Sequence, residues 1–94
     1  MLASKRRRGT VIVDTLRGIL VVSHENRLFY LPGGGAEADE SFKAAAIREL
    51  KEETSLKTVT CRFLFEHKSF NANHEVFLIE TCGVAKPSLS LIHI

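Results

Sequence analysis

Residues 34–56 read GGAEADESFKAAAIRELKEETSL, and the second half of this stretch predicts an amphipathic helix. Within it, Glu49, Glu52 and Glu53 are spaced i, i+3 and i+4, so their carboxylates project from one helix face. Like charges at this spacing cost about 0.2–0.5 kcal/mol per pair. A cation between them would reverse the sign, and oxygen ligands suit Mg²⁺ or Mn²⁺ better than zinc. The alternative is a solvated acidic face.

The predicted helix begins near Ser41, with Asp39 or Ser41 as its N-cap, and ends at residues 54–55. Ser55 stands where a glycine would adopt the left-handed C-cap conformation without strain, which costs serine about 1 kcal/mol unless another cap forms. Small alanines in the apolar stripe favour a close approach to a sheet. The stripe comprises Phe42, Ala45, Ala46 and Leu50, with Ile47 at its flank.

The residues before the helix extend the pattern. Five residues separate Gly34 from Glu40, and seven more lead to the run Arg-Glu-Leu-Lys-Glu-Glu-Thr-Ser-Leu at residues 48–56. This spacing resembles the signature of the Nudix hydrolases: Gly, five residues, Glu, seven residues, Arg-Glu, an aliphatic, any residue, Glu-Glu, any residue, Gly, an aliphatic. Eight of the nine specified positions match, and Ser55 replaces the second glycine. A long gapped pattern of charged residues is specific.

The resemblance implies an α+β fold of the Nudix type, an α/β/α sandwich in which the Nudix helix packs on one face of a mixed β-sheet. It covers roughly residues 9–82, and the C-terminal helix that the family ordinarily carries is missing. Because the chain has only 94 residues, we interpret residues 1–94 as a single, C-terminally short domain, which is either a natural truncation or a fragment. Residues 1–8 form a basic tail, and 83–94 a linker and apolar tail.

The resemblance also implies an activity. It implies Mg²⁺- or Mn²⁺-dependent hydrolysis of a nucleoside diphosphate linked to another moiety, with water attacking phosphorus. Catalytic roles fall on Arg48, Glu49, Glu52 and Glu53 by their match to the family's motif. The metal ligands implied are the three glutamates and Gly34, through its carbonyl.

Other residues of the motif are expected to support the site. Glu40 and Arg48 match a pair that is mainly structural in the family, in which a charge-assisted hydrogen bond ties the loop to the helix. Gly33 and Gly35 extend a loop free of Cβ atoms, where backbone can approach a ligand closely.

The resemblance does not assign the general base. In some family members the counterpart of Glu49 helps to activate water, and in others the base follows the later strands. Glu75 and Glu80 are candidates only by proximity in sequence, and outward-facing strand positions are the simpler interpretation. We therefore keep three functional interpretations: a nucleotide hydrolase, which we favour, a catalytically weak or inactive nucleotide- or partner-binding module, and an incomplete domain stabilised by oligomerisation.

Strands are predicted on both sides of the helix, because short β-branched and aromatic runs alternate with turn residues. The apolar segment 89–94 is expected to dock as a short strand within the chain or to swap into a homodimer. The predicted strands are 9–14, 18–23 and 28–31, and a hairpin pairs 56–69 with 74–82 across a turn at 71–73.

The composition and charge of the chain argue against polymeric nucleic acid and membranes as partners. The net charge is +2, and residues 5–8 alone carry four positive charges, so the remainder is mildly acidic and unlike a polymeric nucleic-acid-binding surface. We interpret this basic run as a solvated tail; contact with substrate phosphates is the alternative. No apolar run reaches membrane-spanning length, and we do not expect a secretory signal, because no apolar h-region follows the charges at the start of the sequence. Cys61 and Cys82 are expected to be reduced, buried thiols of a cytoplasmic protein.

The nucleotide substrate is left open by the sequence. Oxidised nucleoside triphosphates, ADP-ribose and dinucleoside polyphosphates are all compatible with the motif. Four aromatic residues could stack on a base, although core packing is the simpler interpretation for each. They are Phe29, Tyr30, Phe70 and Phe77.

Overall fold

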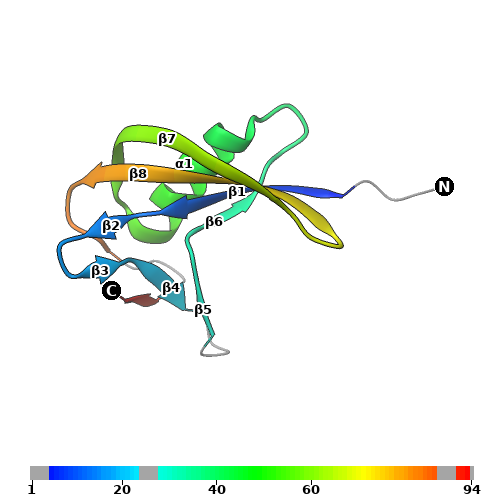
Figure 1. Cartoon of the computed structure of the whole chain (residues 1–94). Coiled ribbons are helices and arrows are strands. Elements are labelled where there is room, and N and C mark those ends of the chain that lie inside the picture. The colour runs from blue at the N-terminus through cyan, green and yellow to red at the C-terminus, as the bar shows by residue number, and fades with distance from the viewer. Residues whose placement is uncertain (1–4, 24–27, 87–90, 94) are drawn as a thin grey trace.

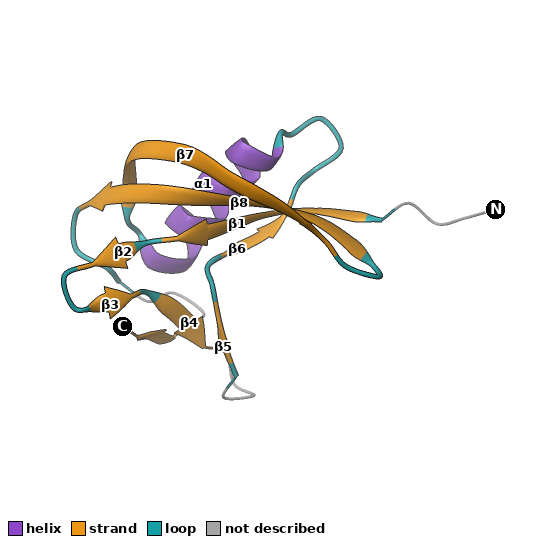
Figure 2. Ribbon diagram, viewed as in Figure 1, coloured by secondary structure: helices purple, strands orange, loops and turns teal. Residues whose placement is uncertain are grey.

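A computed structural model describes residues 5–23, 28–86 and 91–93. It has the predicted α+β architecture (Figures 1 and 2). In chain order the elements are β1 (Arg6–Ile12), β2 (Asp14–Thr15), β3 (Gly18–Ile19), β4 (Val21–Ser23), β5 (Phe29–Tyr30), β6 (Gly33–Gly35), α1 (Phe42–Thr54), β7 (Lys57–Lys68), β8 (Ala72–Cys82) and β9 (Leu91–His93).

A four-stranded sheet with the order β6-β1-β8-β7 forms the centre of the molecule. β1 runs parallel to β8, and the other two pairs are antiparallel, so the sheet is mixed as predicted. β7 and β8 form the predicted long hairpin, but β8 already begins at Ala72, inside the segment predicted to be the turn.

Helix α1 packs against one face of this sheet and lies behind the strands in Figure 1. The approach is close because small residues meet: a Cβ at Gly9 would overlap the Phe42 carbonyl oxygen and lie 2.9 Å from the Ala46 Cβ. The predicted stripe residues Ala45, Ala46 and Leu50 are buried in this contact. The core cluster comprises Val11, Val13, Leu20, Val22, Ala46, Leu50, Leu56, Phe77 and Ile79.

The C-terminal segment docks within the chain, which confirms one of the two expected outcomes. β9 pairs antiparallel with β4, and β5 pairs with the other edge of β4. Residues 89, 90 and 94 of the predicted segment lie outside the described residues.

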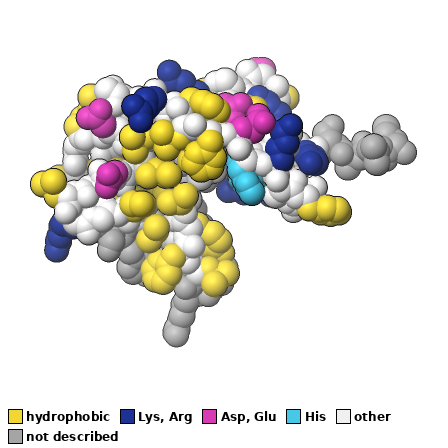
Figure 3. Space-filling model, viewed as in Figure 1, with side chains coloured by type: hydrophobic (Ala, Val, Ile, Leu, Met, Phe, Trp, Pro, Cys, Tyr) yellow, Lys and Arg dark blue, Asp and Glu magenta, His cyan; other side chains and the backbone are white. Residues whose placement is uncertain are grey.

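One long strand edge is open. β7 is an outer strand of the four-stranded sheet, and Val59, Phe63 and Phe65 on it are exposed. Figure 3 shows apolar side chains gathered over the middle of the sheet. An exposed apolar edge favours pairing with a second copy, so the expected homodimer stays a prediction.

The structure corrects two predictions about local conformation. Residues 6–8 are not a solvated tail, because the parallel ladder with β8 starts at Arg6 opposite Ala72 and gives their backbone partners. Residues 1–4 of the predicted tail lie outside the described residues. The glycine run is not a loop but the short strand β6, antiparallel to β1.

Two further properties bear on the sequence predictions. Cys61 and Cys82 are both free, but only Cys61 is partly buried; the predicted burial of Cys82 is wrong because it ends β8 at the surface. None of the described residues belongs to a helix with the length and apolarity of a membrane span.

Helix α1 is capped at both ends, by one of the two predicted N-cap residues and by a left-handed Ser55. The Ser41 Oγ accepts a hydrogen bond from the Ala44 N–H at 3.0 Å, so Ser41 is the N-cap. Ser55 has φ 65° and ψ 6°, the left-handed conformation, and its N–H donates to the Lys51 carbonyl oxygen at 2.8 Å. The cap is therefore the type that glycine forms without strain, although the residue is serine.

Replacing the strained cap should stabilise the fold. We expect Ser55→Gly to raise the free energy of unfolding by about 0.5–1 kcal/mol, because glycine adopts positive φ without a Cβ clash. Urea unfolding monitored by circular dichroism measures this change. Ser55→Ala is the matched control, since it removes the hydroxyl and keeps the Cβ. Equal stability of the two variants would show that the cap is not strained.

Candidate active site

The site is built where strand β6 lies against the acidic face of α1. Gly33 has φ 144°, a conformation that L side chains rarely adopt, and a Cβ there would overlap the Gly9 carbonyl oxygen. A Cβ at Gly34 would overlap the Glu49 carboxylate. Glycine is thus required at these two positions, once for conformation and once for close approach. The result is a backbone strand in direct contact with a helix carboxylate.

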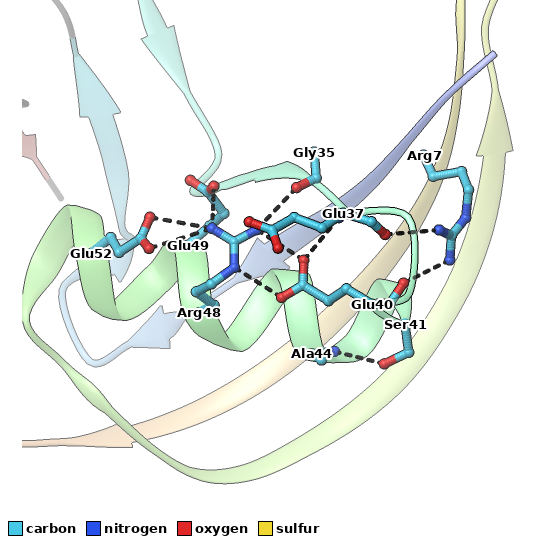
Figure 4. Close-up of polar contacts among 9 residues, drawn as sticks. All are labelled: Arg7, Gly35, Glu37, Glu40, Ser41, Ala44, Arg48, Glu49 and Glu52. Carbon is cyan, nitrogen blue, oxygen red and sulfur yellow. Dashed lines mark hydrogen bonds and ion pairs between the residues drawn. The ribbon is translucent and has the colours of Figure 1, made fainter. Parts of the chain in front are cut away.

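The guanidinium of Arg48 connects β6, the loop between β6 and α1, and helix α1 itself (Figure 4). Arg48 Nε and Nη2 donate to the two carboxylate oxygens of Glu40 at 2.8 and 2.9 Å, and Nη2 also donates to the Gly35 carbonyl oxygen at 3.0 Å. Its Nη1 donates to Glu49 Oε1 at 2.9 Å and lies 3.4 Å from both Glu52 carboxylate oxygens. The bidentate pair predicted between Glu40 and Arg48 is present, and its guanidinium also separates two of the like-charged helix acids.

The ion pair shifts the pKa values of both Glu40 and Arg48. The Arg48 guanidinium, followed by the backbone N–H of Glu37, lowers the pKa of Glu40 from 4.5 to about 2, while burial opposes the shift. The Glu37 N–H donates to Glu40 Oε1 at 3.1 Å. The pKa of Arg48 is raised, chiefly by Glu40. Both groups are therefore charged over the whole physiological pH range.

A second arginine holds the same loop, and the sequence analysis did not identify it. Arg7 donates to the backbone carbonyl oxygens of Glu37 at 3.3 Å and Glu40 at 2.8 Å (Figure 4). Its guanidinium also lies 4.8 Å from the centre of the Phe42 ring. Strand alternation could have predicted this contact, had the basic run been recognised as a strand.

The three helix carboxylates face the glycine strand and Arg48. Glu49 lies against Gly34, Glu52 approaches Arg48 and is more than half exposed, and Glu53 Oε1 accepts from the Gly33 N–H at 2.9 Å. None of them points away from the glycine strand and its supporting arginine. Glu53 and Gly33 together link the C-terminal part of α1 to β6.

The three glutamates fit a hard divalent cation in donor chemistry, since their carboxylate oxygens lie beside the glycine backbone of β6 or beside Arg48. Among the described residues, however, no three His, Cys, Asp or Glu side chains converge closely enough to hold a metal. The reason is visible in the contacts: Arg48 holds Glu49 and Glu52, and the Gly33 N–H holds Glu53. A cation would have to compete with these partners.

A cavity of about 530 Å³ opens beside Glu53 and Gly33. Tyr30 is the aromatic residue of its lining, so a stacking role stays open for it. The core role is confirmed for Phe77, which is buried. It is wrong for Phe29 and Phe70, which are 61% and 97% exposed.

Neither candidate general base lines this cavity. Glu80 is exposed on β8 and accepts a hydrogen bond from the Thr60 hydroxyl at 2.8 Å, as expected for an outward strand residue. Glu75 is half-buried and lies in register with Gly9 on one side and Glu66 on the other.

Comparisons with known proteins agree with this arrangement. The model of the NUDIX domain matches residues 4–87. A crystal structure from Chromobacterium violaceum, provisionally assigned to the Nudix hydrolase family, is 32% identical, with a TM-score of 0.90 over 100% of this chain and 64% of that one. A structure from a study of MutT from Aliivibrio salmonicida and Vibrio cholerae shares the fold at 18% identity, with a TM-score of 0.75 over 94% of this chain and 78% of that one.

A curated protein sequence gives a shorter match. YtkD of Bacillus subtilis (strain 168), named provisionally as an 8-oxo-dGTP diphosphatase, is 39% identical over 49 residues. The match covers 52% of this chain and 31% of YtkD. This chain therefore spans less than two thirds of the length of both YtkD and the Chromobacterium violaceum protein.

The lowered pKa of Glu40 predicts a specific acid sensitivity. Because its folded-state pKa lies below the ordinary 4.5, the ionised form stabilises the fold above pH 4.5, and this contribution is lost as the pH falls toward 2. We expect Glu40→Gln to be less stable than the parent at pH 7 and the difference to shrink between pH 4.5 and 2. Urea unfolding across this pH range measures it.

Glu66→Gln is the control for this experiment, because Glu66 is exposed on β7 and lies 3.8 Å from Lys68. Its pH profile should run parallel to that of the parent. A Glu40→Gln profile that also runs parallel would mean that the ion pair with Arg48 does not stabilise the folded state.

Proposed function

We propose that this chain, which belongs to the NUDIX domain family, hydrolyses nucleotides in which a nucleoside diphosphate is linked to another group, with water attacking phosphorus. The observation that carries the proposal is the contact of the α1 carboxylates with strand β6 beside a cavity of nucleotide size. A purely structural role gives no reason to crowd three acids on one helix face.

We infer that the site takes Mg²⁺ or Mn²⁺, held by Glu49, Glu52, Glu53 and the carbonyl oxygen of Gly34. When bound, the ion would neutralise the diphosphate and stabilise the charge that develops on the leaving oxygen. The support is the oxygen-only donor set on one helix face and the close approach of Gly34 to Glu49.

The chain's own residues prepare this site before any ligand binds. Glu40 fixes the Arg48 guanidinium from one side, and Arg48 in turn fixes Glu49 next to the strand. Glu53 is the helix carboxylate that reaches the cavity. These contacts fix the carboxylates near β6, and a cation would bind by displacing part of the contacts that Arg48 and the Gly33 N–H make with them.

A nucleoside triphosphate is the first substrate to test. The support is the local similarity to YtkD, whose name refers to an oxidised deoxyguanosine triphosphate. A panel should also contain a nucleoside diphosphate linked to a sugar, because the cleaved diphosphate is common to both classes.

Removing one helix carboxylate should abolish turnover without unfolding the protein. We expect Glu52→Gln and Glu53→Gln each to lower kcat at least about 100-fold with Mg²⁺, because each removes one charged ligand. Their melting temperatures should stay near that of the parent. The glutamine at position 53 still offers an oxygen to the Gly33 N–H. Release of phosphate or pyrophosphate from the panel measures the activity.

Glu66→Gln is again the control, since it removes an exposed carboxylate of another element. If both α1 variants hydrolyse at the parent rate, the proposed catalytic face is wrong. If the parent binds nucleotides with Mg²⁺ but does not turn them over, the chain is instead a nucleotide-binding module.

A further inference from the structure

The cavity beside the acidic face has one basic wall. In β1, Arg7 and Gly9 face α1, so Arg6 and Arg8 face the opposite side of the sheet, where both line the cavity. Arg8 lies in register with His74 of β8, which also lines it. Figure 3 shows a histidine beside Lys and Arg side chains near the start of β1.

This basic wall reaches the glycine strand. A Cβ at Gly35 would lie 3.6 Å from Arg6 Nη2, so the Arg6 side chain lies over β6. Glu53 and Gly33 line the same cavity. An anion held by the wall would therefore adjoin the place where the diphosphate is proposed to bind.

The positive charge of the wall is not balanced within the described part of the chain. The ion pairs found there involve Arg48 and Lys68, and no carboxylate oxygen of the described residues lies within 4.0 Å of the Arg6 or Arg8 guanidinium. The acidic residue of the lining is Glu53, whose Oε1 accepts from the Gly33 N–H. Burial is the main cause that lowers the pKa of His74, and the charges of Arg8 and His67 add to the shift.

The other wall of the cavity is apolar. Val22, Tyr30 and Leu31 line it. An apolar and aromatic surface suits a planar base, and paired guanidinium groups suit phosphate oxygens. The cavity thus has an apolar wall that suits the base of a nucleotide and a basic wall that suits its phosphates.

We propose that Arg6, Arg8 and His74 form a phosphate subsite for an anionic group beyond the diphosphate that is cleaved. This inference rests on the proposed function. The subsite makes the protein selective for nucleoside triphosphates over nucleoside diphosphates linked to an uncharged sugar. Guanidinium groups pair well with phosphate oxygens, and a third phosphate is the anionic group that a nucleoside triphosphate has and an uncharged sugar lacks.

Binding of inorganic tripolyphosphate in the absence of divalent ions tests the subsite without any turnover. We expect calorimetry to show that the Arg6→Gln/Arg8→Gln double variant binds at least about tenfold more weakly than the parent. Arg8→Lys should bind more tightly than Arg8→Gln, because it keeps the charge. Arg62→Gln, on the exposed face of β7, is the control and should bind like the parent.

Turnover tests the selectivity. The ratio of kcat/KM for a nucleoside triphosphate to that for a nucleoside diphosphate sugar should fall at least about tenfold in the double variant, through KM. Circular dichroism confirms that the variants fold. Unchanged tripolyphosphate binding or an unchanged ratio would overturn the subsite.

The two proposals fail differently. Arginine-dependent tripolyphosphate binding by a parent that hydrolyses nothing would support the subsite and overturn the hydrolase. Hydrolysis that depends on the α1 carboxylates, together with equal losses for both substrate classes in the double variant, would support the hydrolase and overturn the subsite. Failure of the parent to bind tripolyphosphate overturns the subsite in either case.

Discussion

The bidentate ion pair between Glu40 and Arg48 holds the site together. The guanidinium that this carboxylate fixes also donates to the Gly35 carbonyl oxygen and to Glu49. One side chain thus sets the distance between loop, strand β6 and helix α1. Because charge-assisted bidentate hydrogen bonds are directional, the pair determines orientation as well as attraction. The short glycine strand can lie this close only because Gly33 and Gly34 lack a Cβ.

The same contact explains why the helix acids do not form a metal cluster in the free chain. Three carboxylates on one helix face repel one another, and Arg48 offsets part of that repulsion by lying between Glu49 and Glu52. The Gly33 N–H holds Glu53. A divalent ion must therefore replace partners that the carboxylates already have. Its affinity is set by the difference in free energy between its contacts with the carboxylates and the contacts with Arg48 and the Gly33 N–H that it replaces.

The sequence pattern predicted those features that depend on interactions between residues close together in the chain. The α1 boundaries and the Ser41 cap follow from the pattern within residues 34–56, and the Glu40–Arg48 pair follows from the resemblance of this stretch to the Nudix signature. The sequence left open whether Ser55 would be left-handed or another cap would form. Long-range pairing was not predictable in this way. Residues 6–8 became a strand because β8, more than 60 residues later, supplies a parallel partner, and with that came the basic wall and the Arg7 contact. The four consecutive basic residues 5–8 show no alternation of polar and apolar side chains, so neither the basic wall nor the Arg7 contact could be predicted from them.

The central claim is that the acidic face of α1 and strand β6 form one cation-binding surface. Paramagnetic broadening by Mn²⁺ in a ¹⁵N-labelled sample tests it most directly, because the effect falls steeply with distance from the ion. The account predicts that substoichiometric Mn²⁺ broadens the amides of Gly33–Gly35 and of residues 49–53 first. Broadening that begins at Glu66, Glu75 or Glu80, or that spreads evenly over the acidic residues, would contradict it.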